Sequence, residues 1–400
     1  MSRPGLTAVP RAVRHFHHLA AADRARLFLA EPGEIRVDGD RELLATALGA
    51  TLYIPADRPG LADTVLRRSA EGITSVVLDL EDAVRESGIE EATRNAVGAL
   101  DELAAAGDPS TALVFLRARG MGCIPRIVEL MSGTAADALT GFVIPKFDGR
   151  TAEAWLTQTA DAATALGKHL YVMPVLESER ILYRETRDAE LETLSTALAE
   201  HRESVLAVRV GATDMCGALG IRRDRDHTIY DVRVVADVLA DIVNRLGRRD
   251  GTGFVVTAPV WEYFADHERM FRPFLRATPF VEHRAVRFRD QLVSRDLDGL
   301  LREISLDRVN GMLGKTVIHP NHVAPVHALS VVTAEEYRDA CAIVGADAGG
   351  VLRSDYRNKM NEARPHAIWA RQVLRRAEVF GVANDGVTFV DLLVALAGLG

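Results

Sequence analysis

The chain of 400 residues is 48% hydrophobic and 26% charged, which is typical of a folded globular protein and excludes a disordered or fibrous one. Its formal net charge of -8 at pH 7 leaves no excess of basic residues to neutralise a phosphate backbone, so no nucleic-acid partner is expected. The three cysteines, Cys123, Cys216 and Cys341, show no paired spacing, which argues against a disulfide scaffold or a thiolate zinc site and favours a reducing cytoplasm.

Residues 1–48 precede the first predicted strand and are expected to form an N-terminal helical extension. They contain arginines but no uninterrupted apolar run of signal-peptide length, and no later segment has about 18 apolar residues without charge. The sequence therefore predicts a cytoplasmic protein with no membrane partner, and a transit peptide is a less favoured alternative. His15, His17 and His18 lack a matching set of metal ligands, so a surface helix is predicted there.

Eight short apolar runs rich in β-forming residues then follow one another, and a stretch with helical spacing comes after each. They are TLYIPA (51–56), SVVLDLED (75–82), ALVFLRAR (112–119), GFVIPKF (141–147), LYVMPVLE (170–177), VLAVRVGATD (205–214), GFVVTAPVWE (253–262) and KTVIHP (315–320). Runs such as VVLDL are apolar on both faces, which indicates parallel strands covered by a barrel interior on one side and by helices on the other. We therefore predict an α/β protein with a (β/α)8 TIM barrel at residues 49–330.

Two segments go beyond a minimal barrel. Residues 263–313, between the seventh and eighth strands, are rich in arginine and aromatic residues and are expected to form a long helical insertion. Residues 331–400 are expected to form a C-terminal helical lid or tail, with helices at 333–348 and 361–380 joined by a polar segment that serves as a lid or a subunit contact. The apolar run VTFVDLLVALAGLG needs a surface to cover it, either its own barrel or a neighbour's.

The catalytic groups of such barrels lie at the carboxyl ends of the strands, because eight loops meet there. The residues that end the predicted strands are carboxylates with a few cations: Asp79, Glu81 and Asp82, then Arg117 and Arg119, Lys146, Glu177, Asp214, Glu262, and finally His319. No G-x-G-x-x-G after a strand, no Walker sequence and no G-x-S-x-G occurs, so the chemistry is expected to come from carboxylates, a metal and arginine.

Glu177 and Asp214 end neighbouring predicted strands, so their carboxylates can converge on one hard cation. Mg²⁺ suits such a site, because it takes one or two protein carboxylates and keeps several waters. The alternative is that each residue is a solvated or helix-capping acid, and position alone does not separate the two interpretations.

Arg117 could hold a substrate carboxylate with two parallel hydrogen bonds, and a salt bridge to Asp79 or Glu81 is equally compatible with the sequence. If the strand continues that far, Asp79 and Glu81 face one way and Leu80 the other. One acid could hold a metal-bound water and another could orient Arg117, and a nearby cation is expected because the clustered acids repel. Lys146 could attract an anionic substrate or pair with these acids.

Seven blocks carry a resemblance to a known family. LYIPADRPG, VVLDLEDAV, FLRAR, GFVIPK, MPVLES, VGATD and GKTVIHPNHV resemble, in that order, the citrate lyase β-subunit group of the HpcH/HpaI aldolase superfamily. The tail SDYRNKMNEARPHAIWA and the segment HTIYDV resemble a subgroup of predicted carbon–carbon bond lyases encoded beside tellurium-resistance-type stress genes. The resemblance implies a homo-oligomeric, Mg²⁺-dependent lyase that cleaves or condenses an oxo or hydroxy acid, or its thioester, through an enolate.

The resemblance also implies roles for single residues. Glu177 and Asp214 would bind Mg²⁺. Arg117 would bind the carboxylate or carbonyl oxygens of the substrate, and Glu81 and Asp82 would support the metal-bound water and the arginine. Beside these implied roles, we expect Arg117, Glu81, Asp82 and Asp79 to be catalytic, and Arg117, Lys146, Gly211 and Ala212 to bind the small carboxylic acid substrate.

Two departures weaken the case for CoA recognition. The chain has RESGIEEATR where members acting on CoA esters usually show a proline and a lysine downstream of DLEDAV, and Ala118 replaces the asparagine of the family's VRIN. Two alternatives follow: an aldolase for free pyruvate-like acids that does not use CoA, and a non-catalytic, ligand-sensing barrel in a stress-response system.

Overall fold

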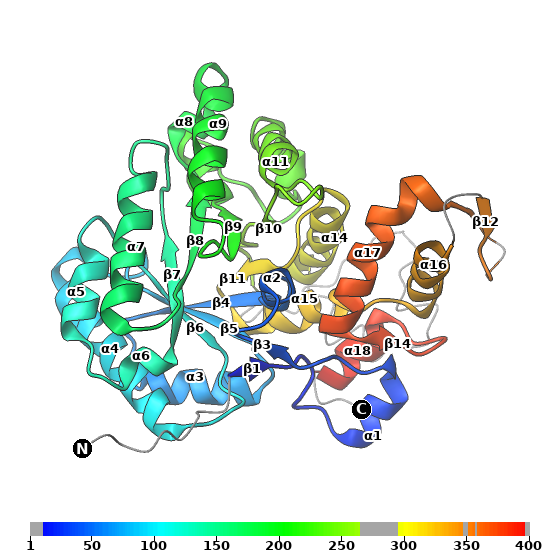
Figure 1. The fold of residues 1–400 in the computed structure, drawn as a ribbon, viewed down its shortest axis with the longest axis horizontal. Helices are drawn as coiled ribbons and strands as arrows, with labels where there is room; N and C mark the ends of the chain where they lie inside the picture. The colour runs from blue at the N-terminus through cyan, green and yellow to red at the C-terminus, as the bar shows by residue number, and fades with distance from the viewer. Residues whose placement is uncertain (1–10, 265–294, 347–350, 357, 397–400) are drawn as a thin grey trace.

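The computed structural model describes residues 11–264, 295–346, 351–356 and 358–396. Its centre is a sheet of eight parallel strands in the order β10-β9-β8-β7-β6-β5-β4-β11, shown in Figure 1. They are β4 (Ala50–Pro55), β5 (Ser75–Asp79), β6 (Leu113–Arg117), β7 (Leu139–Ile144), β8 (Tyr171–Leu176), β9 (Ala207–Val210), β10 (Val255–Thr257) and β11 (Lys315–Val317). A parallel bridge between Ala258 and Lys315 joins the two edges and nearly closes the sheet. The predicted α/β TIM barrel is confirmed, and each strand overlaps one of the eight predicted runs.

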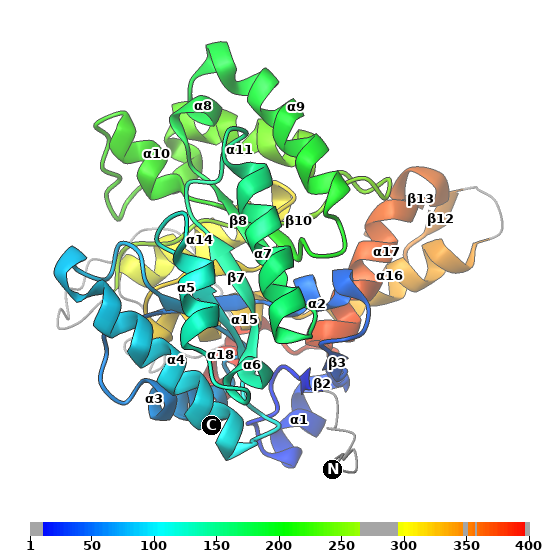
Figure 2. The same cartoon turned by 60° about the vertical axis from the view of Figure 1, so that its left-hand side comes forward.

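Helices follow the strands and cover the outside of the barrel, as the two views in Figures 1 and 2 show. They are α3 (Leu61–Ala70), α4 (Ile89–Ala106), α5 (Cys123–Leu130), α6 (Ala135–Ala138), α7 (Ala152–Leu166), α8 (Glu179–Leu182), α9 (Arg184–Glu200), α10 (Ala212–Ala218), α11 (Arg233–Leu246), α14 (Arg295–Val309) and α15 (Val323–Ser330). Helices α4 and α7 end at Gly107 and Gly167, whose left-handed backbone conformation favours glycine and stops the helix.

Alternating side chains of the strands belong to two different cores. Phe115 of β6 belongs to the cluster that fills the barrel, whereas its neighbour Leu116 belongs to the cluster beneath the outer helices. In β8, Met173 likewise belongs to the cluster that fills the barrel, and its neighbour Val172 belongs to the cluster beneath the outer helices. Both faces of each strand are therefore buried, which explains why the strand sequences are apolar without alternation.

The N-terminal extension contains short strands as well as helices. Its elements are β1 (Ala12–Val13), α1 (Ala21–Leu27), β2 (Phe28–Ala30), β3 (Ile35–Arg36) and α2 (Arg41–Ala47). The side chain of Asp40 caps α2 by accepting hydrogen bonds from the amides of Glu42 and Leu43. Because α2 leads directly into β4, the extension covers the amino ends of the barrel strands.

The C-terminal extension joins the N-terminal one at this end of the barrel. Both predicted helices are present, as α16 (Ala334–Gly345) and α17 (Ala363–Phe380). Strand β14 (Val382–Ala383) pairs with β2, and Arg375 of α17 forms an ion pair with Glu42 of α2. The last helix, α18 (Phe389–Leu396), buries Val390 and two leucines in the core that fills the barrel. The described part of the final apolar run is therefore covered by its own barrel, and homo-oligomer formation stays a prediction.

The polar segment that joins the two tail helices forms a hairpin of β12 (Val351–Arg353) and β13 (Met360–Glu362). The hairpin contacts α16 and α17, and in both views it lies far from α8, which follows the carboxyl end of β8. It is thus part of a tail and does not cover the mouth of its own barrel.

The prediction of a surface helix around His15 is wrong. The segment is a turn, and His15 and Phe16 are each 1% exposed. Nε2 of His15 lies 3.0 Å from the carbonyl oxygen of Ala47, and its ring centroid lies 4.6 Å from that of His327. Burial lowers the pKa of His15 to about 3. Because His327 comes from the other end of the chain, the local sequence pattern did not indicate this burial.

Most of the predicted insertion between the seventh and eighth strands lies outside the described residues. Its last part is α14, a helix as predicted. Among the residues that the structure describes, no helix is long and apolar enough to cross a membrane.

Candidate active site at the barrel mouth

The candidate site residues gather at the carboxyl ends of β5, β6, β7 and β8, which we call the barrel mouth. Strand register places Asp79 beside Arg117 on neighbouring strands. Glu177 follows β8 directly, and Lys146 is the second residue after β7. The sequence thus brings these four side chains to one opening, as the barrel geometry requires.

Asp79 and Glu81 hold Arg117 in place. Nε and Nη2 of Arg117 donate to the two oxygens of Asp79 over 2.6 and 2.7 Å, and Nη1 lies 2.6 Å from Oε2 of Glu81. The salt-bridge alternative is therefore present in the structure. A guanidinium has five N–H groups, so Nη1 and Nη2 each keep one for a ligand. The side chain is 13% exposed, which leaves Arg117 both oriented and accessible from the mouth.

Glu81 lies between two cations. Its Oε1 accepts a hydrogen bond from Nζ of Lys146 over 2.7 Å, and its Oε2 pairs with Arg117. Burial raises the pKa of Glu81, while Arg117 and Lys146 oppose that rise. Strand β5 ends before Glu81, yet Leu80 faces the outer core, as the alternating pattern predicted.

Asp82 lies at the rim. Its side chain is 59% exposed, and its carboxylate lies 3.8 Å from Nη1 of Arg117 and 3.9 Å from Nζ of Lys146. These distances are too long for strong hydrogen bonds, so Asp82 adds charge to the mouth without fixing either cation.

The charges of Glu177 and Asp214 repel each other, although only Glu177 lies directly at the end of a strand. Strand β9 ends at Val210, and Asp214 lies in the first turn of α10, so the predicted strand 205–214 is too long at its carboxyl end. Glu177 is 7% exposed. Burial, and then the charge of Asp214, raise the pKa of Glu177 to about 8. Two acids that repel each other in a buried place favour a bound cation.

The backbone of two neighbouring residues fixes the position of Glu177. The amide of Lys146 donates to Oε1 of Glu177 over 2.8 Å, and Lys146 adopts a φ of 49°, which is uncommon for a residue with a side chain and is often found at functional sites. A Cβ at Gly211 would lie 1.7 Å from Oε2 of Glu177, so only glycine leaves room for the carboxylate. Ala212, 2% exposed, begins α10 beside it.

Acidic groups outnumber cationic groups here. The carboxylates of Asp79, Glu81, Asp82, Glu177 and Asp214 meet the side chains of Arg117 and Lys146, and Arg209 lies beneath them. Five negative and three positive charges leave -2 when all are ionised, which a divalent cation neutralises. The described residues contain no group of three or more His, Cys, Asp or Glu side chains suited to a metal, but Mg²⁺ takes only one or two carboxylates. The residues present therefore fit Mg²⁺.

Sequence reasoning missed Tyr53 and Arg209. The guanidinium carbons of Arg117 and Arg209 lie 5.3 and 5.5 Å from the centroid of the Tyr53 ring. Arg209 is 1% exposed and donates to the hydroxyls of Thr51 and Thr316 over 3.3 and 2.6 Å. An arginine at an inward-facing position of an apolar strand was the signal that could have revealed it. Cation–π contacts thus continue from the mouth into the barrel interior.

Two other strand-end candidates make separate contacts around the mouth. Oε1 of Glu262 accepts a hydrogen bond from the hydroxyl of Thr213 over 2.8 Å. The ring of His319 stacks on Phe264 with centroids 4.5 Å apart. Both contacts orient loops beside α10 and β11.

A family model described as C–C bond lyase of the TIM-barrel fold matches residues 42–382. A comparison with curated proteins gave no match. Among solved structures, the chain is similar to the protein CitE from Mycobacterium tuberculosis in complex with magnesium, acetoacetate and coenzyme A, with 20% identity, a TM-score of 0.52, and coverage of 83% of this chain and 99% of that one. It is also similar to a citrate lyase from Burkholderia xenovorans LB400, with 16% identity, a TM-score of 0.58, and coverage of 86% and 96%. At these identities, the likeness to solved structures concerns the fold.

Proposed function

Because the chain belongs to the family of C–C bond lyases of the TIM-barrel fold, we propose that it uses Mg²⁺ to make or break a carbon–carbon bond in a small oxo or hydroxy acid or its thioester. The observation that carries the proposal is the mutual repulsion of Glu177 and Asp214 beside the oriented guanidinium of Arg117. The similar fold of a protein that binds magnesium, acetoacetate and coenzyme A supports this substrate class.

Glu177 and Asp214 would hold the metal. When bound, Mg²⁺ supplies Lewis-acid stabilisation of the negative charge that develops on a substrate oxygen. The raised pKa of Glu177 means that its carboxyl group is largely protonated at neutral pH before a cation arrives. Binding of the ion would therefore release a proton from Glu177.

Arg117 would bind the substrate carboxylate with the N–H groups that Asp79 and Glu81 leave available. Asp79 and Glu81 hold the guanidinium from two sides, so the donor is in place before the substrate enters. Preorganised donors of this kind are typically worth about 3 kcal/mol each in the transition state, or roughly 100-fold in rate. Lys146 would add a second positive charge at the rim.

Glu81 is the residue that we assign to proton transfer. Burial raises its pKa above the ordinary value of a glutamate, which brings a carboxylate closer to the pKa that suits a general base near neutral pH. Its two oxygens contact Arg117 and Lys146, so both the position and the charge of this carboxylate are defined. Asp82 is more exposed and would assist from the rim.

The free acid is the second candidate substrate. Arg119, a cation near the mouth that could attract a CoA phosphate, is already paired with Glu86 in the segment where the family's lysine is missing. This pairing favours an acid that lacks the nucleotide part.

The test combines Mg²⁺ titration calorimetry with turnover assays on oxaloacetate, pyruvate with aldehydes, and acyl-CoA thioesters. We expect Mg²⁺-dependent turnover by the wild type and a loss of at least about 100-fold in Glu177→Gln and in Arg117→Gln. The variant Glu179→Gln changes an exposed carboxylate and serves as the control. Unchanged Mg²⁺ affinity in Glu177→Gln and Asp214→Asn would contradict the metal site. Intact Mg²⁺ binding without turnover on any substrate would favour the ligand-sensing barrel.

A further inference from the structure

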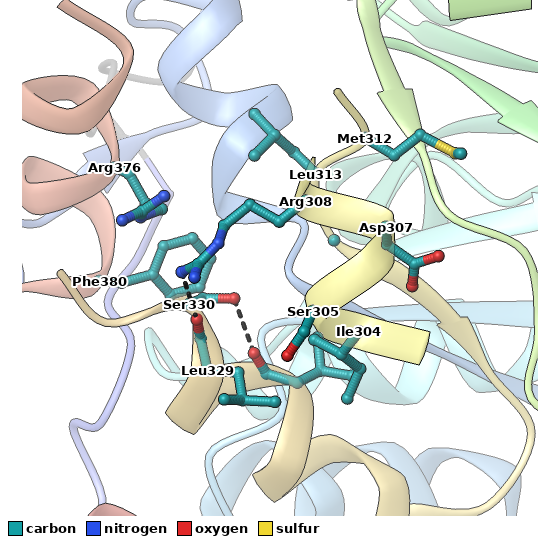
Figure 3. Close-up of a pocket in the computed structure, with 12 residues that line it drawn as sticks. Ile304, Ser305, Asp307, Arg308, Met312, Leu313, Leu329, Ser330, Arg376 and Phe380 are labelled. Carbon is teal, nitrogen blue, oxygen red and sulfur yellow. Dashed lines mark hydrogen bonds between the residues drawn. The ribbon is translucent and has the colours of Figure 1, made fainter. Parts of the chain in front are cut away.

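A second site candidate lies at the amino end of the barrel, remote from the mouth. Helices α14, α15 and α17 surround a small hollow there that opens to solvent. Its walls are largely apolar, formed among others by Ile304, Leu313, Leu329 and Phe380. Figure 3 shows these side chains around the hollow.

Two arginines line the hollow, Arg308 from α14 and Arg376 from α17, as Figure 3 shows. Arg376 of α17 is 8% exposed. Its Nη2 donates to Oε2 of Glu336 over 2.9 Å, whereas its Nε is buried and has no hydrogen-bond partner among the described residues. Arg308 of α14 donates only weakly, from Nη1 to the carbonyl oxygen of Leu329 over 3.3 Å, and no carboxylate in the described part of the chain pairs with it.

The acid in the wall does not neutralise these arginines. Asp307 accepts hydrogen bonds from Nζ of Lys315 and from the hydroxyl of Tyr230, both over 2.8 Å, so its two oxygens are already used. Glu336 pairs with Arg376 alone among the two arginines, as far as the described residues show. Burial together with the charge of Arg308 lowers the pKa of Arg376. Arg308, which lies exposed at the hollow, therefore carries a positive charge that an anion would balance.

We propose that this hollow binds a small organic oxyanion, with a carboxylate or phosphate group between Arg308 and Arg376 and an apolar body against Leu313 and Phe380. Guanidinium groups bind both oxyanions through paired N–H donors. Ligand sites commonly combine apolar walls with a few charged groups that fix orientation. An oxyanion would also satisfy the buried Nε of Arg376. This site is separate from the barrel mouth and does not depend on the function proposed there.

The first test is thermal unfolding of the full chain in increasing inorganic phosphate, in acetate, and in chloride at equal ionic strength and pH. We expect a saturable rise in the unfolding midpoint with phosphate, acetate or both, and none with chloride. Response to phosphate alone assigns the phosphate class, and response to acetate assigns the carboxylate class. Arg308→Gln and Arg376→Gln should abolish the rise, whereas Arg371→Gln, an exposed arginine on the same helix as Arg376, should keep it.

The second test is a crystal soaked with selenate, in which anomalous scattering should place the ion between the two guanidinium groups. Should Arg376→Gln fail to fold, Arg308→Gln carries the comparison, because Arg308 makes a single long hydrogen bond. The proposal would be overturned if phosphate or acetate stabilised the wild type and the three variants equally, or if chloride had the same effect. A soaked crystal with no selenate between the two guanidinium groups would also overturn it.

Discussion

Replacing Glu177 by glutamine should change how the stability of the metal-free protein depends on pH. In the folded chain, burial and the charge of Asp214 raise the pKa of Glu177 from 4.5 to about 8. Between these values the folded state holds a proton that the unfolded state has lost, so the stability of the wild type falls as pH rises. Glutamine is neutral at every pH and keeps the oxygen that accepts from the amide of Lys146.

The size of the effect follows from the two pKa values. A tenfold difference in proton affinity corresponds to about 1.4 kcal/mol, so a rise from 4.5 to about 8 destabilises the fully ionised folded state by about 5 kcal/mol. Roughly 3 to 4 kcal/mol of this loss falls between pH 5 and pH 8. Glu177→Gln should lack this loss and should therefore be the more stable protein at pH 8 in EDTA.

Urea unfolding followed by tryptophan fluorescence measures this difference at several pH values, with Glu179→Gln as the matched control. Excess Mg²⁺ should restore the wild type at pH 8, because the ion binds the ionised carboxylates, and it should have no such effect on Glu177→Gln. If the difference in free energy of unfolding between wild type and Glu177→Gln stays constant from pH 5 to pH 8, Glu177 is ionised throughout and the reasoning about the acid pair is wrong.

Gly211→Ala should weaken Mg²⁺ binding at least about tenfold in calorimetry, because its Cβ would displace Glu177, the proposed metal ligand. Gly98→Ala, with open space around it, should not. Asp79→Asn should lower the free energy of unfolding by about 3 kcal/mol in urea, since it leaves the charge of Arg117 poorly paired in a buried position. The pKa of His15 is lowered from 6.5 to about 3, so the imidazole takes up a proton in the unfolded chain before it does so in the folded one. The free energy of unfolding should therefore fall by about 2 kcal/mol between pH 7 and pH 5. His15→Asn should remove that part of the acid sensitivity, and equal slopes in both proteins would show that the buried histidine does not cause it.

The barrel was predictable because each strand is apolar on both faces and is followed by a helix, a local pattern that repeats eight times. The position of Arg117 beside Asp79 followed from the same pattern, since both residues end neighbouring strands. The end of the sixth predicted strand was placed too late, because VGATD gives no local sign that the helix begins at Ala212. The glycine before it is the helix cap and carries no side chain to mark that role.

Features that depend on distant contacts were not predictable from one sequence. The burial of His15 depends on His327 and Phe380, which come from the far end of the chain. The unusual backbone of Lys146 is stabilised by the hydrogen bond that its amide donates to the carboxylate of Glu177, and the local sequence IPKF does not indicate a positive φ. Arg209 was visible as a charge within an apolar strand, but its place beneath Tyr53 required the closed barrel.

The pairing of the first barrel strand with the last has a consequence during synthesis. Lys315 of β11 lies beside Ala50 of β4. Another 265 residues (315 minus 50) must therefore be synthesised after β4 before its second neighbouring strand emerges from the ribosome. At about 5 to 20 residues per second, this takes roughly 15 to 50 s. Throughout that time the nascent chain presents an open, apolar strand edge that can pair with other chains. Production of the soluble protein should therefore respond strongly to chaperone supply and to the speed of translation through the second half of the message.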